Sequence, residues 1–188
     1  LFRSNGIRPI RVLNREAEIS GQRIITHLNQ LYSKQEKYLL VEVEVPSTQS
    51  ERTREVANVE ISYANMLTRT TDEIASTLSV RFTESKELVQ TNTNQEVMVS
   101  CVLQKATDAN RLATNLRDKG KLAEAKQVLL DNGRYLERNA TRWNSTQLGD
   151  YASEQKLDVL NLDDDVKYNL RRKQMRSSQF KNELQQSY

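Results

Sequence analysis

The chain has 188 residues, with one cysteine, one histidine, two prolines and five glycines. The single cysteine, Cys101, excludes an intramolecular disulfide, so cysteine usage leaves the compartment open. No apolar run approaches the roughly 18 residues that a transmembrane helix needs. The glycines are scattered, and none has the GxGxxG or GxxxxGK spacing of a phosphate-binding loop. The sequence opens with Leu1 rather than methionine, so we expect an upstream segment that would carry any targeting signal.

Three candidates for chemistry are present, and each fits a structural role better. His27 has no cysteine, serine or acid at a recognisable catalytic spacing, although catalysis requires a nucleophile and an orienting group to converge on it. Cys101 lies among apolar residues, where a thiol is more often a small core residue. The acidic run at residues 163–165 lacks the alternate spacing and glycine of a calcium loop, so we interpret it as helix capping. We therefore expect no catalytic residue, no cofactor and no metal site.

The first half of the chain alternates apolar and polar residues. The alternation covers residues 38–45, 57–63 and 74–82, and shorter candidates lie at residues 7–13, 17–20 and 23–28. Such a period of two is typical of half-buried antiparallel strands, whose successive side chains leave opposite faces. Turn signals such as Ser20-Gly21 and Pro46-Ser47 separate the segments. We predict an antiparallel β-sandwich over residues 1–93.

Near Asn94 the period changes to that of a helix. Asn94 can cap a helix whose small and apolar residues recur at spacings of three and four as far as Leu116. Lys119 and Gly120 supply a basic last turn and a terminator. A second seam runs from Leu122 to Trp143, and it includes the polar positions 132 and 139. We predict an α+β protein whose helical region, residues 94–188, contains an antiparallel hairpin over residues 95–143.

A last helix is expected at about residues 163–184, and it carries the main charged cluster of the chain. The net charge is +3. The first 94 residues balance 12 basic against 12 acidic side chains, so the whole excess lies in the second half. The possible anion-binding residues are Arg171, Arg172, Lys173 and Arg176. They could contact nucleic acid or an anionic membrane, but a solvated helix face is the favoured interpretation.

Several segments resemble the region that follows the von Willebrand factor A (VWA) domain in bacterial VWA-domain proteins. Residues 31–41, LYSKQEKYLLV, resemble the family phrase L-Y-x-x-Q-E-R-Y-V-L-V. Residues 59–63, 80–82 and 94–97 resemble its later strands and first helix, and residues 117–125 are similar to its helical hairpin turn. None of these motifs is catalytic. The VWA domain and its metal-dependent adhesion motif are absent from these 188 residues, so the resemblance implies an accessory region and no active site.

The leading hypothesis is a non-catalytic accessory and interaction module that flanks a VWA domain. Its partners would be the upstream VWA domain, a second copy of the chain or another protein, and the resemblance favours the bacterial cell envelope or periplasm. The alternative is an anion-binding module that uses the last helix. Because few strands are available for a closed sandwich, we also expect an apolar patch or unpaired edge within residues 7–90. Ile10, Val12, Ile24 and residues 39–45 are the expected places.

Overall fold

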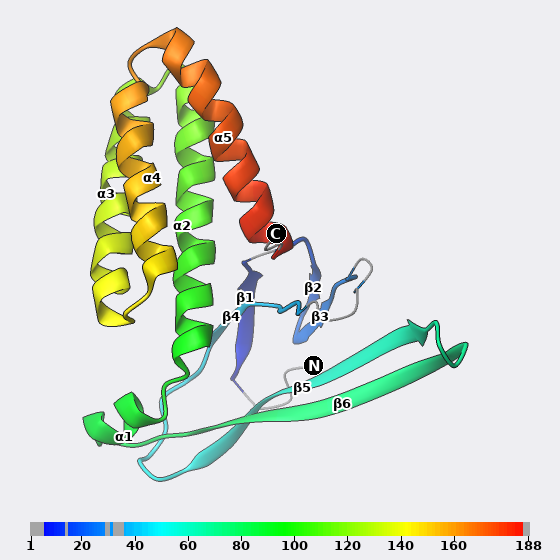
Figure 1. Cartoon of the computed structure of the whole chain (residues 1–188). Coiled ribbons are helices and arrows are strands. Elements are labelled where there is room, and N and C mark those ends of the chain that lie inside the picture. Colours follow the sequence, from blue (N-terminus) through cyan, green and yellow to red (C-terminus); the bar gives the residue numbers. More distant parts are fainter. Residues whose placement is uncertain (1–5, 14, 29–30, 32–35, 186–188) are drawn as a thin grey trace. The chain divides into compact units, whose positions relative to one another are not determined.

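The computed structural model describes residues 6–13, 15–28, 31 and 36–185 (Figure 1). The chain divides into two compact units. The first, here called the β unit, comprises Leu1–Gln30 and Val41–Asn92. The second, the helical unit, comprises Leu31–Leu40 and Thr93–Tyr188. The chain therefore enters the helical unit, returns to the β unit, and then forms the long helices. The domain boundary expected at residues 93/94 stays a prediction.

The described residues form six strands where the alternation predicts them, and these strands pair in three separate antiparallel sheets. The strands are β1 (Arg8–Val12), β2 (Glu18–Ser20), β3 (Arg23–Ile25), β4 (Val41–Glu44), β5 (Thr53–Asn65) and β6 (Thr70–Arg81). The pairs are β1 with β4, β2 with β3, and β5 with β6. A short helix, α1 (Lys86–Thr91), follows, and the Ser85 hydroxyl accepts a hydrogen bond from Leu88 N at 3.2 Å to cap it.

The predicted β-sandwich is not formed by the described strands. A sandwich needs two multi-stranded sheets that bury their inner faces against each other, whereas each sheet here has two strands. The buried cluster of the β unit is small and consists of Ile7, Val56 and Ala57, with partly buried residues such as Val43 around it. Alternation identifies the apolar face of a strand, but it does not determine which strands pair or which sheets stack.

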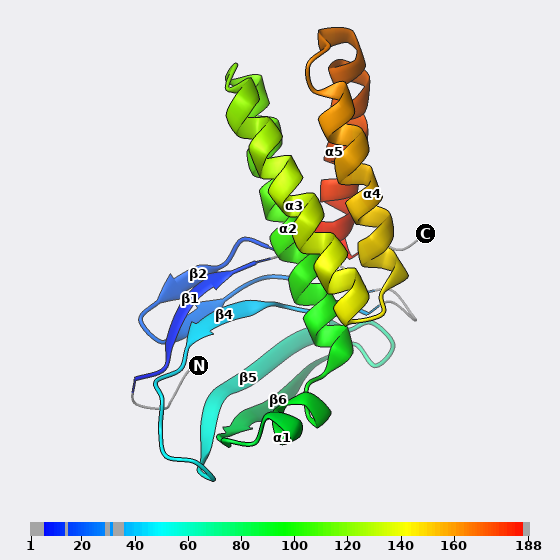
Figure 2. The ribbon, with the colours of Figure 1, turned by 90° about the vertical axis from the view of Figure 1, so that its left-hand side faces the viewer.

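Among its described residues, the helical unit has four long helices. They run alternately up and down (Figures 1 and 2). They are α2 (Gln95–Asp118), α3 (Leu122–Arg142), α4 (Thr146–Asn161) and α5 (Asp165–Leu184). Helices α2 and α3 pack against each other, so the predicted hairpin is confirmed. Helix α2 also contacts α4 and α5. No helix in the described ranges has the length and apolarity needed to cross a membrane.

The ends of α2 follow directly from the local sequence. The Asn94 side chain accepts a hydrogen bond from Val97 N at 3.1 Å, which satisfies one of the free donors of the first turn. At the other end, Gly120 has a φ of 75°, a conformation that glycine adopts without strain. Gly120 N donates to Arg117 O and Lys121 N donates to Leu116 O, both at 2.9 Å. These two bonds form a Schellman motif, which turns the chain directly into α3.

Helix α4 was not predicted from the sequence. It is capped by Ser145, whose hydroxyl accepts from Leu148 N at 3.4 Å, and its buried positions have helical spacing. Gln155 and Asp158 occupy two of these buried positions. Because two of the buried positions of α4 are polar, its apolar residues alone do not show the periodicity of a helix.

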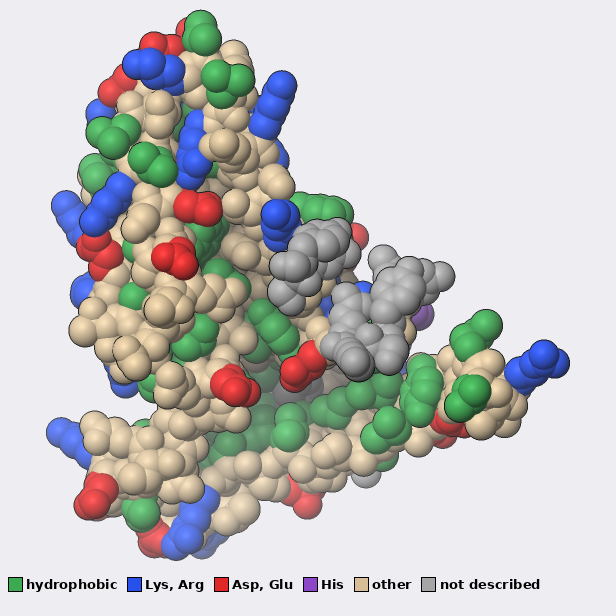
Figure 3. All heavy atoms as spheres, in the orientation of Figure 1, with side chains coloured by type: hydrophobic (Ala, Val, Ile, Leu, Met, Phe, Trp, Pro, Cys, Tyr) green, Lys and Arg blue, Asp and Glu red, His purple; other side chains and the backbone are tan. Residues whose placement is uncertain are grey.

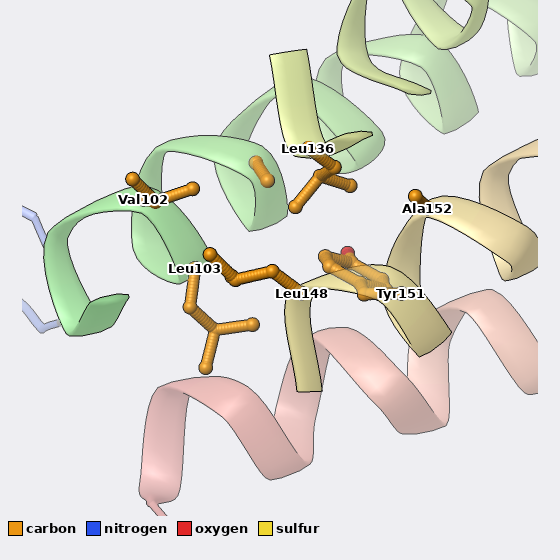
Figure 4. Close-up of a cluster of buried hydrophobic side chains, with 7 residues drawn as sticks. Val102, Leu103, Leu136, Leu148, Tyr151 and Ala152 are labelled. Atoms are coloured by element: carbon orange, nitrogen blue, oxygen red, sulfur yellow. The ribbon is translucent and has the colours of Figure 1, made fainter. Parts of the chain in front are cut away.

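Two apolar clusters hold the helices together. One contains Val102, Leu103, Ala106, Leu136, Leu148, Tyr151 and Ala152, contributed by α2, α3 and α4. Figure 4 shows that their side chains point toward one another. The other cluster contains Ala113, Ala125, Leu129, Leu162, Tyr168 and Met175. Only the second cluster includes buried residues of α5.

The buried leucine of α3 provides a test of this packing. Leu129 is fully buried, whereas its neighbour Leu130 is 39% exposed. Leu129→Ala should lower the free energy of unfolding by about 2–5 kcal/mol, since it leaves a cavity in the core. Leu130→Ala is the matched control and should cost about 1 kcal/mol or less. Urea denaturation would measure both values, and equal losses would contradict the arrangement.

Candidate functional site

A layer of buried polar side chains lies between the two apolar clusters of the helical unit. Along α2, for example, the order is Ala106 in the first cluster, then Asn110, then Ala113 in the second. Along α3 the order is reversed: Leu129 belongs to the second cluster, Asn132 follows it, and Leu136 belongs to the first cluster. The layer consists of Thr107, Asn110, Thr114, Asn132, Gln155, Asp158 and Gln179.

Asn110 and Gln155 are the centre of this polar layer. The Asn110 amide donates to Gln155 Oε1 at 2.9 Å and to Asp158 Oδ2 at 3.0 Å. Gln155 Oε1 also accepts from Asn132 Nδ2 at 2.9 Å, while Gln179 Nε2 donates to Asn110 Oδ1 at 2.7 Å. All four long helices are therefore joined by hydrogen bonds at one level. These bonds satisfy the Asn110 amide and Gln155 Oε1, whereas Gln155 Nε2 is buried without a hydrogen-bond partner among the described residues.

Arg171 and Asp158 form the ionic part of the layer. The Arg171 guanidinium contacts Asp158 Oδ1 through Nε, and its Nη2 donates to Glu154 O at 3.2 Å. The Asp158 side chain is 2% exposed and that of Arg171 is 14% exposed. Burial raises the pKa of the Asp158 carboxyl, while the hydrogen bonds and charge of Arg171 act in the opposite direction. Asp158 also accepts from Asn110 Nδ2, and Arg171 Nη1 donates to Gln174 Oε1 at 2.6 Å, so both members of the pair have the further hydrogen bonds that a buried ion pair needs.

A second ionic cluster surrounds Asp118 at the end of α2. Arg172 binds the Asp118 carboxylate through two nitrogens, with Nε–Oδ1 at 2.9 Å and Nη2–Oδ2 at 2.7 Å. The Tyr168 hydroxyl donates to Asp118 Oδ1 at 3.0 Å, and Arg176 Nη2 lies 3.6 Å from Oδ2. The hydrogen bond from Arg172 lowers the pKa of Asp118. Burial, followed by the neighbouring Asp118, raises the pKa of Tyr168 to about 12.

The four residues predicted to bind anions lie on α5, and three of them belong to these ionic clusters. Arg171, Arg172 and Arg176 each contact a carboxylate of the same chain, and Lys173 is exposed. The acidic partners of the three arginines lie on other helices, so the local sequence shows only a basic stretch. Asp158 lies on α4, the helix that the sequence did not reveal.

Tyr38 is bound by α2 and by Gln185, the residue that caps the end of α5. Tyr38 N donates to Gln185 Oε1, and Gln185 Nε2 donates back to Tyr38 O, both at 2.7 Å. The buried Gln104 amide donates to the Tyr38 hydroxyl at 3.2 Å and to Asn182 O at 2.8 Å. These bonds hold Tyr38 against α2 and the C-terminal end of α5.

The β5–β6 hairpin of the β unit has one apolar face and one polar face. Directly paired residues share a face, so Ile61 and Ile74 lie side by side, as do Ala57 and Leu78. The apolar face carries Val59, Ile61, Tyr63, Ile74, Leu78 and Val80, which are 38–54% exposed. At the tip, Met66 and Leu67 are 87% and 93% exposed. Figure 3 shows hydrophobic side chains spread along this hairpin.

The predicted apolar patch within residues 7–90 is present, but its main part lies on the β5–β6 hairpin and not at the expected residues. Ile10 is exposed, as expected, but Ile24 packs against the small buried cluster of the β unit. Leu39 is also exposed, although it belongs to the helical unit. The largest group of exposed apolar side chains lies on β5 and β6, which were expected to be half-buried.

The other sequence candidates have structural surroundings. His27 follows β3 and is exposed. Cys101 is half-buried on α2, where burial raises the pKa of its thiol. Capping by the acidic run is confirmed, since Asp164 Oδ1 accepts from Val166 N at 2.9 Å and Lys167 N at 3.0 Å. Within the part of the chain that the structure describes, no three His, Cys, Asp or Glu residues are grouped to hold a metal ion.

Comparison with known proteins gives no match to a family model, to a curated protein or to a solved structure.

The buried ion pair can be tested by removing one charge at a time. Asp158→Asn should lower the free energy of unfolding by about 3 kcal/mol, because it leaves the Arg171 guanidinium buried without its carboxylate. Glu154→Gln is the control, since Glu154 Oε2 lies 4.0 Å from Arg171 and is 45% exposed. It should cost less than about 1 kcal/mol. The double variant Asp158→Leu/Arg171→Met should be more stable than Asp158→Asn, as measured by urea denaturation.

The Asp118 cluster predicts a pH dependence of stability. Because its pKa is lowered in the folded protein, the carboxylate stabilises the fold fully above its ordinary pKa of about 3.9 and loses this effect as the pH falls through the folded value. The difference in free energy of unfolding between the natural chain and Asp118→Asn should therefore be larger at pH 7 than at pH 3. Asp131→Asn, at an exposed position paired with Arg134, should change stability by less than about 0.5 kcal/mol at either pH. A difference that grows toward low pH would contradict the prediction.

Proposed function

We propose that this chain is a non-catalytic accessory module that flanks a VWA domain and supports protein–protein contact or assembly. The observation that carries the proposal is the exposed apolar face of the β5–β6 hairpin. Six large apolar side chains lie on one side of two paired strands, and two more lie at the tip. Continuous exposed apolar surfaces of this kind mark interaction sites more often than isolated exposed residues do.

The polar face of the same hairpin supports an interaction role. The polar residues of this face alternate along the strands with the apolar ones, and they include Glu60, Ser62, Glu73 and Thr77. Only one face of the hairpin is therefore apolar. An isolated two-stranded hairpin is marginally stable in water, and it gains stability when its apolar face is covered. A protein surface that supplies apolar side chains would provide this cover.

The helical unit supports the accessory role in a different way. Its buried polar layer joins all four long helices, which favours one fixed arrangement of the bundle. The segment that resembles VWA-associated proteins is bound through Tyr38 to α2 and α5. We infer that this segment attaches a neighbouring domain to a rigid helical support.

The alternative function, anion binding by α5, has less support. A cation that already binds a carboxylate must exchange it for the incoming phosphate, which offsets part of the electrostatic gain. Arg171, Arg172 and Arg176 are in this situation. The ion pairs give the three arginines a role in the fold.

The proposal can be tested by binding. The coding sequence around these residues should encode a VWA domain, and the 188-residue chain should bind that purified domain in calorimetry. Ile61→Thr/Ile74→Thr should weaken binding at least about tenfold, because it removes apolar contact while keeping β-branched side chains. The matched control, Glu60→Gln/Ser62→Thr on the polar face, should change affinity by less than about twofold.

Two results would overturn the proposal. One is the absence of an adjacent VWA domain, and the other is an affinity that the Ile61→Thr/Ile74→Thr variant leaves unchanged. Circular dichroism of each variant would establish that the fold is retained.

A further inference from the structure

The outer edge of strand β6 is not paired with any strand of the described residues. All 12 of its residues are described, and β6 pairs only with β5 among the described strands. The strand contains no proline, glycine or lysine, and the bulge of the hairpin lies on β5, near Val56. Natural proteins usually protect a long exposed edge with such features, because its free N–H and C=O groups can pair with another strand. The strand does carry the charged residues Asp72, Glu73 and Arg81, so its edge is suited to a partner strand with complementary charges.

The sequence of β6 is complementary to itself when two copies run antiparallel. In a continuous sheet, directly opposite residues must share a face, so only every second register is allowed. One allowed register places Glu73 opposite Arg81 of the second copy, and a two-fold axis makes this contact twice. The same register pairs Ile74 with Val80 and places Thr77 opposite Thr77. Opposite charges, β-branched pairs and threonine pairs are each favourable across strands.

We propose that β6 pairs with β6 of a second copy of this chain in that register, forming a four-stranded sheet in the order β5–β6–β6–β5. The contact is isologous, as is usual for symmetric dimers. It satisfies the free edge of both copies and brings Ile74, Leu78 and Val80 of each into one apolar surface. This inference does not depend on the proposed VWA partner.

The neighbouring allowed registers are worse. A shift by one step in one direction places the charged Asp72 opposite Val80, and it moves Glu73 away from Arg81. A shift in the other direction places Arg81 opposite Ala75. Glu73 then faces residue 83 of the second copy, which lies beyond the end of β6, and no longer meets Arg81. The charges at the two ends of β6 therefore select a single register. Arg81 also contacts Glu51 of its own chain, and both of these side chains are exposed.

The first experiment measures the association of the 188-residue chain by sedimentation equilibrium. The natural chain should form a dimer. Glu73→Arg and Arg81→Glu should each weaken association at least about tenfold, because each places like charges opposite one another twice. The double variant Glu73→Arg/Arg81→Glu restores opposite charges and should recover most of the affinity. Glu51→Gln is the control for the ion pair within the chain and should leave the dimer intact.

The second experiment reads the register directly by disulfide formation in a Cys101→Ser background. Thr77→Cys places two thiols on the two-fold axis, where paired Cα atoms are about 4.5–5.5 Å apart and a disulfide is feasible. Thr71→Cys lies on the same polar face but has no cysteine opposite it in this register. Mild oxidation should therefore cross-link Thr77→Cys and leave Thr71→Cys monomeric in denaturing electrophoresis.

A chain that stays monomeric at all concentrations would overturn the proposal. So would a dimer that the charge variants leave unchanged, or one in which Thr71→Cys cross-links as efficiently as Thr77→Cys. If the natural chain dimerises but does not bind the VWA domain, the proposed function is wrong and the pairing of β6 with β6 is unaffected.

Discussion

The helical unit depends on one buried polar layer. Apolar contacts can hold helices together in several registers, because a leucine packs acceptably against many neighbours. The amides of Asn110, Asn132 and Gln155 and the ion pair of Asp158 with Arg171 accept far fewer arrangements. A shift of one helix by a turn would leave buried donors and a charge unsatisfied, which costs more than the apolar contacts could recover. The layer thus selects a single arrangement from those that the two apolar clusters would allow.

The β unit follows the opposite principle. Its small buried cluster is formed by Ile7, Val56 and Ala57, and most apolar side chains of β5 and β6 remain exposed. The backbone ladder and alternating side chains define the hairpin, but they do not supply a cover for its apolar face. The two units therefore differ in packing. The polar groups of the helical unit are buried among its own helices, whereas the β unit has an exposed apolar surface and, among the described strands, an unpaired strand edge.

The sequence predicted the elements that follow a regular pattern. All six strands and the α2–α3 hairpin were predicted, because their apolar spacing reflects local geometry. The α4 helix was missed because Gln155 and Asp158 lie in its buried face. This omission also affected Arg171, which was assigned to an exposed basic stretch although its carboxylate partner lies on α4. Two polar residues, Asn132 and Asn139, lie in phase with the predicted apolar seam, and Asn132 belongs to the buried polar layer. The predicted β-sandwich is absent among the described strands for a different reason: the alternation of apolar and polar residues does not determine which sheets stack.

The binding of Tyr38 by Gln185 has a consequence for the order of folding. The two residues are separated by 147 positions, and the whole β4–β6 region is inserted between the segment at residues 38–40 and the first long helix. Local contacts between successive helices can form early, since each closes only a short loop. The contacts of Tyr38 close the longest loop in the helical unit, so we expect them to form last. A fragment that begins at residue 93 would retain the four long helices, but the buried amide of Gln104 would lose the tyrosine hydroxyl that accepts its hydrogen bond. The helical unit is thus discontinuous in sequence, and cutting the chain at the apparent boundary would remove a part of its own structure.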